Sequence, residues 1–284
     1  MELFRYDVNK YSPTQMVIIP LILLIVSLAI VGMTMMSTGL PVKPGMDFSG
    51  GTAITIVTTD SKETLAAEFS AYPLTEIGEG INGAKFLKFS SMDDAQFRSL
   101  SALVSEKYPD AKIDQIGESF GKSLQEQAIF AVLISFIGMA IVIFLVFRNF
   151  IPSCAVVLSA FADMVMTAAA MNVIGIPLSL GTTAALLMLI GYSVDSDILL
   201  TMRVFKRQGK FEEKLGGAFH TGIIMTSTAI AAIAAMLVVT YLGQVEIIMQ
   251  MSAVILIGLF FDIMNTWLTN AAILKWYVNR RGSR

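Results

Sequence analysis

Long apolar runs separated by short polar turns dominate the chain. A helix needs about 20 mostly apolar residues to cross the hydrocarbon core of a bilayer, and the sequence contains six runs of about that length. They lie near residues 16–36, 127–147, 151–174, 178–201, 221–241 and 246–267. The pattern therefore predicts a polytopic α-helical membrane protein with six transmembrane helices.

Composition agrees with this class and excludes several others. Hydrophobic residues make up 55% of the 284 residues, charged residues 15%, and the mean hydropathy is +0.70, whereas soluble domains have about 25% charged residues. A net charge of −2 gives no basic excess for nucleic acid. With one Cys (Cys154) and one His (His220), disulfide frameworks and Cys/His zinc sites are excluded. We expect no nucleic-acid partner, no metal and no cofactor.

Basic residues gather in segments that share one side of the membrane if the spans alternate. These are the amino terminus (1–15), the turn at Arg148, the loop between the fourth and fifth runs, and the tail at 268–284, which together hold 12 of the 20 Lys and Arg. Short cytoplasmic loops carry such an excess. The sequence therefore predicts a multi-pass protein of the cell membrane, in contact with membrane lipid, with both termini cytoplasmic.

The segment at 37–126 is the one long polar stretch, with 8 basic and 13 acidic residues. Its strand, helix and turn signals occur in the order β-α-β-β-α-β. The elements are a strand at Ala53–Thr58, a helix from Ser61 to before Pro73, strands at Thr75–Ile81 and Ala84–Phe89 around Asn82-Gly83, a helix from Ser91 to Tyr108, and a strand at Ala111–Ile116. We therefore expect one α+β ferredoxin-like extracytoplasmic domain between helices 1 and 2.

Four carboxylates interrupt the apolar runs: Asp163, Asp195, Asp197 and Asp262. A charge near the middle of the bilayer costs about 2.5 to 3.5 kcal/mol on insertion scales, so each needs an interior partner, water or a proton. Helical spacing puts Asp195 on a stripe of mostly small residues, which predicts that it points into a packed seam, while Asp197 shares another face with Ser193 and Thr201.

Two interpretations of these carboxylates stay open. Ser159, Asp163 and Thr167 form a polar stripe on the third run, which favours a proton or water route between the third and fourth helices. Alternatively, Asp163 and Asp195 make structural hydrogen bonds between helices. Asp197 and Asp262 would then reach the inner interface, where Asp197 meets Arg203 or Lys206. His220 is either a titrating group or an ordinary interfacial residue.

A glycine-rich motif follows the first run and contains Gly45, Asp47, Phe48, Gly50, Gly51 and Thr52. Its glycines allow a tight turn, and Asp47 can bond local amides. With Gly121-Lys122-Ser123-Leu124, Ala162-Asp163 and Gly191-Tyr192-Ser193, in this order, the chain resembles the archaeal type of SecF in the SecD/SecF family. That family has the half-unit layout of the resistance-nodulation-division (RND) transporter superfamily.

The resemblance implies a subunit that pairs with SecD, associates with the SecY translocation channel and helps an exported polypeptide leave the membrane. Proton flow is the implied energy source, with Asp163 at the family's acidic position in helix three. Asp195-Ser196-Asp197 replaces the bacterial Asn-Asp-Thr, and Arg203 fits the arginine after that span. A basic residue of bacterial members would fall near Gly222, where this chain has only His220 nearby.

Two other functions compete with protein export. An intramembrane aspartyl protease would pair Asp163 with Asp195, but its Gly-x-Gly-Asp turn is missing because Val194 precedes Asp195. A small-molecule exporter of the RND superfamily would usually carry 12 spans and two outer domains in one chain. We therefore expect a transport subunit and not an enzyme.

Overall fold

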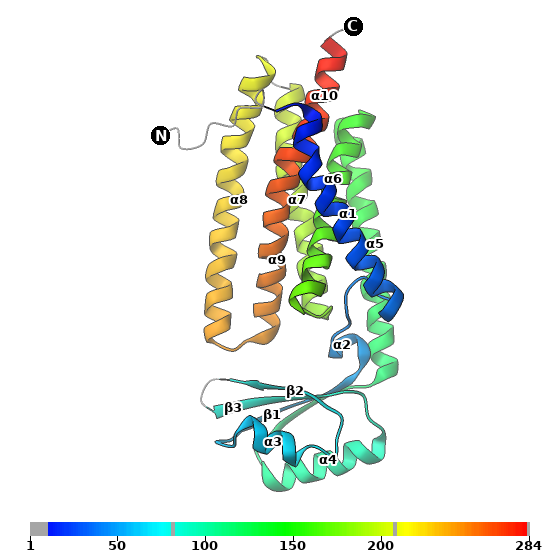
Figure 1. The fold of residues 1–284 in the computed structure, drawn as a ribbon, viewed down its shortest axis with the longest axis vertical. Coiled ribbons are helices and arrows are strands. Elements are labelled where there is room, and N and C mark those ends of the chain that lie inside the picture. The colour runs from blue at the N-terminus through cyan, green and yellow to red at the C-terminus, as the bar shows by residue number, and fades with distance from the viewer. Residues whose placement is uncertain (1–10, 81–82, 207–208, 283–284) are drawn as a thin grey trace.

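The computed structural model describes residues 11–80, 83–206 and 209–282. A bundle of long helices stands on a small α/β domain, and the start of α1 (Pro13–Thr38) and the end of α10 (Ala271–Gly282) lie at the opposite end of the bundle from that domain (Figure 1). Six of the described helices are long and apolar enough to cross a membrane. The prediction of six spans is therefore confirmed at the level of helix length and composition.

The spanning helices extend past the apolar runs at several ends. They are α1 (Pro13–Thr38), α5 (Glu118–Phe147), α6 (Phe150–Ile174), α7 (Leu180–Lys206), α8 (Phe211–Leu242) and α9 (Glu246–Met264), which continues through η3 (Asn265–Asn270) into α10 (Ala271–Gly282). Hydropathy marks only the part of a helix that suits lipid, so the polar first turns of α5 and α8 lie outside the predicted runs. Likewise, the predicted end of the sixth run near residue 267 falls inside continuous helix.

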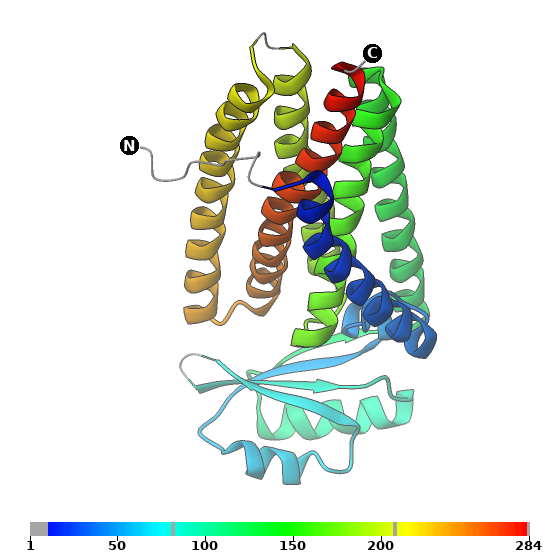
Figure 2. The ribbon, with the colours of Figure 1, turned by 45° about the horizontal axis from the view of Figure 1, so that its top comes forward.

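The middle of the bundle is built by α6, α7 and α9. More than half of the residues in the most apolar part of α6 and of α7 are buried, whereas few of those in α1, α5 and α8 are. Helix α1 crosses α6, and α9 packs against α6, α7 and α8 (Figure 2). Side chains of α6, α7 and α9 that face one another are therefore removed from both lipid and water.

The outer domain is a four-stranded antiparallel sheet with two helices on the face away from the bundle (Figure 1). Its elements are β1 (Gly51–Val57), α3 (Lys62–Glu68), β2 (Leu74–Glu79), β3 (Ala84–Phe89), α4 (Asp94–Lys107) and β4 (Lys112–Ile116), and the strand order is β2-β3-β1-β4. The predicted order of strands and helices is found here. Asn82 of the predicted hairpin lies outside the described residues.

Local capping corrects one predicted boundary in this domain. Asp93, and not Ser91, is the residue before α4, because its side chain accepts a 2.7 Å hydrogen bond from the Gln96 amide. Leu87 and Phe89 of β3 pack with Leu65 of α3 and Leu100 of α4 in a closed apolar core. The outer domain therefore has a hydrophobic centre of its own.

The glycine-rich motif joins the outer domain to the bundle. The Gly45 amide donates to the Leu178 carbonyl at 2.8 Å, and Asp47 Oδ2 accepts from the Leu180 amide at 2.9 Å. The prediction that Asp47 bonds local amides is therefore wrong, since its partner is the first residue of α7. A carboxylate at a helix amino terminus is favoured by unpaired amides and by the helix dipole.

Close backbone approach explains the second glycine of the motif. The short helix α2 (Met46–Ser49) ends at Gly50, which has φ +76°, and a Cβ there would lie 2.9 Å from the Glu118 Cα. Phe48, 1% exposed, packs into the bundle beside Met171 and Leu186. The motif therefore fixes the outer domain against the start of α5 and the start of α7.

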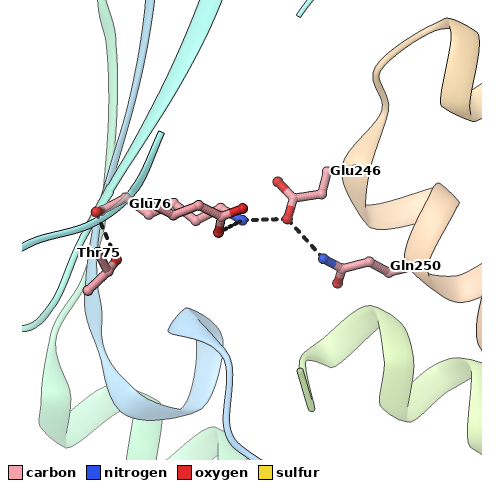
Figure 3. Close-up of polar contacts among 5 residues, drawn as sticks. Thr75, Glu76, Glu246 and Gln250 are labelled. Carbon is pink, nitrogen blue, oxygen red and sulfur yellow. Dashed lines mark hydrogen bonds and ion pairs between the residues drawn. The ribbon is translucent and has the colours of Figure 1, made fainter. Parts of the chain in front are cut away.

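A polar contact forms a second link between the two parts (Figure 3). Lys88 of β3 pairs with Glu246 at the start of α9 and with Glu76 of β2, the latter at 3.1 Å, and Gln250 donates to Glu246 at 2.9 Å. Burial alone would lower the pKa of Lys88, but its hydrogen bond to Glu246 and the charges of Glu246 and Glu76 raise the pKa above its ordinary value. The ammonium group therefore stays charged where the sheet meets the bundle.

Candidate functional site

Three carboxyl groups meet in the interior of the bundle. Asp163 comes from α6, Asp197 from α7 and Asp262 from α9, and each side chain is at most 1% exposed. Buried carboxyl groups require hydrogen bonds or counter-charges, since the ionised form loses its hydration. Their partners therefore decide what the site can do.

Asp163 is held from two neighbouring helices. Ser193 of α7 donates to its Oδ2 at 2.5 Å, and Asn265 of η3 donates to its Oδ1 at 2.7 Å. The Thr167 hydroxyl bonds the Asp163 backbone oxygen at 2.6 Å and so does not reach the carboxyl group. The polar stripe of α6 therefore contacts α7 through Ser193 and the sixth span through Asn265.

Asp262 has hydroxyl partners. Ser196 of α7 lies 2.9 Å and 3.2 Å from its two oxygens, and Thr266 donates to Oδ1 at 3.2 Å. The interpretation that Asp262 reaches the inner interface is wrong, because its side chain is 1% exposed and points toward α7. Asp262 is therefore part of the interior network, although the sequence did not single it out for this role.

Asp197 has one strong partner within the described residues. Asn270 donates to its Oδ1 at 2.8 Å, and no hydrogen bond reaches its Oδ2. The predicted meeting of Asp197 with Arg203 is wrong, because Arg203 instead bonds the Gly217 carbonyl and the Thr221 hydroxyl at the start of α8. Asp197 is thus an interior group, and Arg203 ties α7 to α8.

The π-helical turn η3 brings both asparagines to the site. Five residues of a regular α-helix turn by about 500°, which would leave Asn265 and Asn270 about 140° apart. The wider π turn lets both face the bundle interior, where each is fully buried and donates to a different carboxyl group. Such π turns are frequent at functional sites, and a 3.6-residue pattern does not reveal them.

Within the described part of the chain, no Lys or Arg forms an ion pair with this network. The five ion pairs formed by residues 11–80, 83–206 and 209–282 lie in the outer domain, at its link to α9, or in the first turn of α5. None involves Asp163, Asp197 or Asp262. Carboxyl groups in such surroundings are suited to gain and lose a proton or a small cation, because no fixed charge locks them in the ionised form.

The structure places Asp195 apart from the other carboxylates. Its side chain is exposed, as are those of Met188 and Tyr192, and a Cβ on Gly191 would meet nothing within 4 Å. The prediction that Asp195 points into a packed seam is therefore wrong. Ser193, Ser196 and Asp197 occupy the inward face, so the part of the stripe at Met188, Gly191 and Asp195 faces outward.

This arrangement also bears on the protease hypothesis. Asp163 is fully buried between α6, α7 and η3, whereas Asp195 lies on the outer surface of α7. An aspartyl dyad needs two carboxyl groups close enough to share one proton, and the structure does not bring these two together. His220 is exposed near the start of α8 and takes no part in the interior network.

Comparisons with known proteins identify the family. Residues 96–280 match the family described as protein export membrane protein SecD/SecF, C-terminal. A protein-export membrane protein SecF from Methanolacinia petrolearia is 56% identical over 279 residues, which cover 98% of this chain and 99% of the relative. The chain belongs to the SecF family.

Other relatives and solved structures agree. A SecF of Haloferax volcanii is 40% identical, over 95% of this chain and 94% of the relative, and a SecF of Pyrococcus furiosus is 38% identical, over 96% and 93%. The crystal structure of SecDF from Thermus thermophilus has the same fold, with a TM-score of 0.75 and 20% identity over 99% of this chain. This SecF-family chain spans 40% of the length of that SecDF chain.

Proposed function

We propose that this chain is the SecF subunit of a SecD/SecF complex that assists the export of polypeptides across the cell membrane. Support comes from the full-length similarity to SecF relatives. The SecDF chain of similar fold is more than twice as long, so a SecD partner would supply the other half. The SecY channel and the exported polypeptide are the further partners that this role requires.

The proposed orientation puts both termini in the cytoplasm and the α/β domain outside. The end of α7, the start of α8 and the end of α10 lie at the end of the bundle opposite the α/β domain (Figure 1). These segments carry the basic residues Arg203, Lys210, Lys214, Lys275 and Arg280, which follows the positive-inside rule. We assign the outer domain, residues 37–126, to the ferredoxin-like class on the grounds of its β-α-β-β-α-β order and its antiparallel sheet. The membrane part then comprises residues 16–36 and 127–267.

Proton flow through the bundle is the proposed source of energy. The observation that carries this proposal is the hydrogen-bonded set of Asp163, Asp262 and Asp197, which joins three helices without an ion pair among the described residues. Protonation of one of these groups changes which hydrogen bonds it can donate or accept. A proton can therefore alter how α6, α7 and the sixth span pack together.

Asp195 has a different proposed role. It lies 15 residues into α7, about 22 Å from the start of that helix, so its exposed carboxyl group is within membrane depth. Exposure to lipid there costs about 2.5 to 3.5 kcal/mol. We therefore assign Asp195 to a contact with another membrane subunit rather than to the interior relay.

A complementation experiment tests the export role. The gene for this chain is deleted in its host and restored on a plasmid, and export of a secreted reporter is followed by pulse-chase, together with co-purification of the SecD partner. We expect export to slow in the deletion strain and to recover with the plasmid, and SecD to co-purify. Normal export in the deletion strain, with altered resistance to small molecules, would instead support an RND-type exporter.

A further inference from the structure

An open groove lies between α1 and α10, at the end of the bundle opposite the outer domain, where the start of α1 stands beside α10 (Figure 2). Its volume is about 420 Å³, and its lining residues are Pro13, Thr14, Val17, Ala272, Ile273 and Trp276. The hydroxyl group of Thr14 is the one polar side-chain group of this set apart from the Trp276 ring nitrogen. The groove therefore has the size of a small-molecule site and suits an apolar guest.

Helical spacing makes the groove a continuous face of each helix. Pro13 and Val17 are four residues apart on α1, and Ala272 and Trp276 are four residues apart on α10, so each pair lies on one side of its helix. Arg280 follows after four more residues, and its Cζ lies 5.3 Å from the centre of the Trp276 ring. The groove therefore combines an apolar surface with a cation at one end.

The depth of the groove matches the boundary between hydrocarbon and headgroups. Pro13 is the first residue of α1, and the apolar run of that helix begins at about residue 16. Trp276 is 45% exposed, and tryptophan is enriched at this boundary. Lys275 donates to the Tyr11 carbonyl at 3.0 Å and so joins α10 to the residues before α1 at the same level. A guest in the groove would have its apolar part in the hydrocarbon and its polar part among the headgroups.

The charge beside the groove favours an anionic guest. Residues 1–15 contain two basic and two acidic residues and so contribute no net charge. Residues 268–284 contain no acidic residue and four basic residues, which are Lys275, Arg280, Arg281 and Arg284. A basic residue near a membrane surface strengthens the binding of anionic lipid about fivefold. A neutral or cationic headgroup gains nothing from this excess.

We propose that the groove between α1 and α10 binds one anionic phospholipid. A lipid chain lies against Val17 and Trp276, and the phosphate lies beside Arg280 and the Thr14 hydroxyl. The lipid covers apolar surface and neutralises basic charge at the same place. It also braces the first span against the helix that continues from η3.

Quenching of tryptophan fluorescence by brominated lipid tests this site. The full chain, alone and co-purified with SecD, is placed in phosphatidylcholine nanodiscs that contain a minor fraction of phosphatidylglycerol or phosphatidylcholine with brominated chains. The chain has two tryptophans, and Trp267 is 3% exposed, so Trp276 gives the response to lipid. We expect brominated phosphatidylglycerol to quench Trp276 with an affinity about fivefold higher, or more, than brominated phosphatidylcholine. Both faces of the disc have the same lipids, so the result does not depend on the orientation of the chain.

Two variants locate the site. Arg280→Gln removes the charge beside Trp276 and should lower the preference for phosphatidylglycerol about fivefold. Thr14→Phe fills the groove from α1 and should reduce quenching by both brominated lipids. The matched control is Lys210→Gln, which removes the same charge from the exposed residue before α8, outside the groove. Quenching of each variant is referred to its own fluorescence in discs without bromine, and that of Lys210→Gln should equal the wild type.

Three outcomes would overturn the proposal. Equal quenching of the wild type by the two brominated lipids would make the groove a contact for any lipid. Quenching by neither lipid in the complex with SecD would mean that protein occupies the groove. A preference for phosphatidylglycerol that Arg280→Gln, Thr14→Phe and Lys210→Gln change to the same extent would place the lipid elsewhere. None of these outcomes alters the result of the complementation experiment, so failure here is distinct from failure of the export role.

Discussion

Asn265 donates a hydrogen bond of 2.7 Å to Asp163, across 102 residues of sequence. The bond joins the sixth span to the third at a point where both side chains are fully buried. Asn265 Oδ1 in turn accepts from Thr269 at 3.2 Å. The amide is therefore oriented from one side and holds the carboxyl group on the other, which makes it the positioning residue of the interior network.

Replacing Asn265 with Leu should destabilise the folded chain. The substitution removes the donor to Asp163 and leaves a buried carboxyl oxygen without that partner, at a cost of about 1 to 3 kcal/mol. Thr228→Val on α8 is the control, because that hydroxyl is exposed and bonds only its own helix. Unfolding in nanodiscs, followed by circular dichroism, measures both. Equal stability of the two variants would show that the bond to Asp163 contributes nothing.

Two glycines of α8 should respond differently to alanine. A Cβ on Gly222 would lie 2.5 Å from the Trp267 ring, whereas a Cβ on Gly216 would meet nothing within 4 Å. Trp267 is 3% exposed, so the ring has little room to move. We expect Gly222→Ala to cost about 1 to 3 kcal/mol.

Gly216→Ala is the matched control for that experiment, since it should be neutral or stabilise the helix by up to about 1 kcal/mol. Thermal unfolding of the two variants measures the difference. If Gly222→Ala is as stable as Gly216→Ala, the packing of Trp267 on α8 does not constrain this position. The same contact leaves no room for a long basic side chain at Gly222 itself.

Lys88 should control the docking of the outer domain on α9. The pKa of Lys88 is raised in the folded chain. Its contribution to the stability of the docked domain is therefore complete below the unfolded-state pKa of about 10.4. That contribution is lost as the pH rises through the folded-state pKa. Lys88→Gln should release the contact at every pH. Distances between spin labels on β2 and on the α8–α9 turn measure the docking.

Lys122→Gln is the control for charge loss, since Lys122 pairs with Glu118 within α5. Its label distances should match the wild type. The docking role of Lys88 fails if the Lys88→Gln distances also match at neutral pH, or if the wild-type distances do not change above the raised pKa.

The sequence predicted where the helices lie better than it predicted which face of each helix packs inward. Hydropathy located the spans because lipid imposes a minimum apolar length. Helical spacing correctly separated Asp195 from Asp197, but it could not say which face pointed inward. The small residues near Asp195 favoured a packed seam, whereas the hydroxyl groups of Ser193 and Ser196 mark the face that packs in the structure.

The sixth span was the least predictable part of the site. Asp262, Asn265, Thr266, Thr269 and Asn270 interrupt an apolar run with five hydrogen-bonding side chains, and that density was the available signal. An α-helical wheel places all five within an arc of about 140°, with Asn265 and Asn270 at opposite edges, and it does not show which neighbouring helix each edge meets. The partners of Asp163 and Asp197 therefore became visible only in the fold.

The most direct test compares Asp163→Asn with Asp195→Asn at matched expression, by pulse-chase of a secreted reporter with and without a proton ionophore. Asn keeps the shape of Asp and removes its proton exchange. The account predicts that Asp163→Asn abolishes the contribution of this chain and that the ionophore then adds no further loss, while export by Asp195→Asn stays sensitive to the ionophore. Normal, ionophore-sensitive export by Asp163→Asn would contradict it.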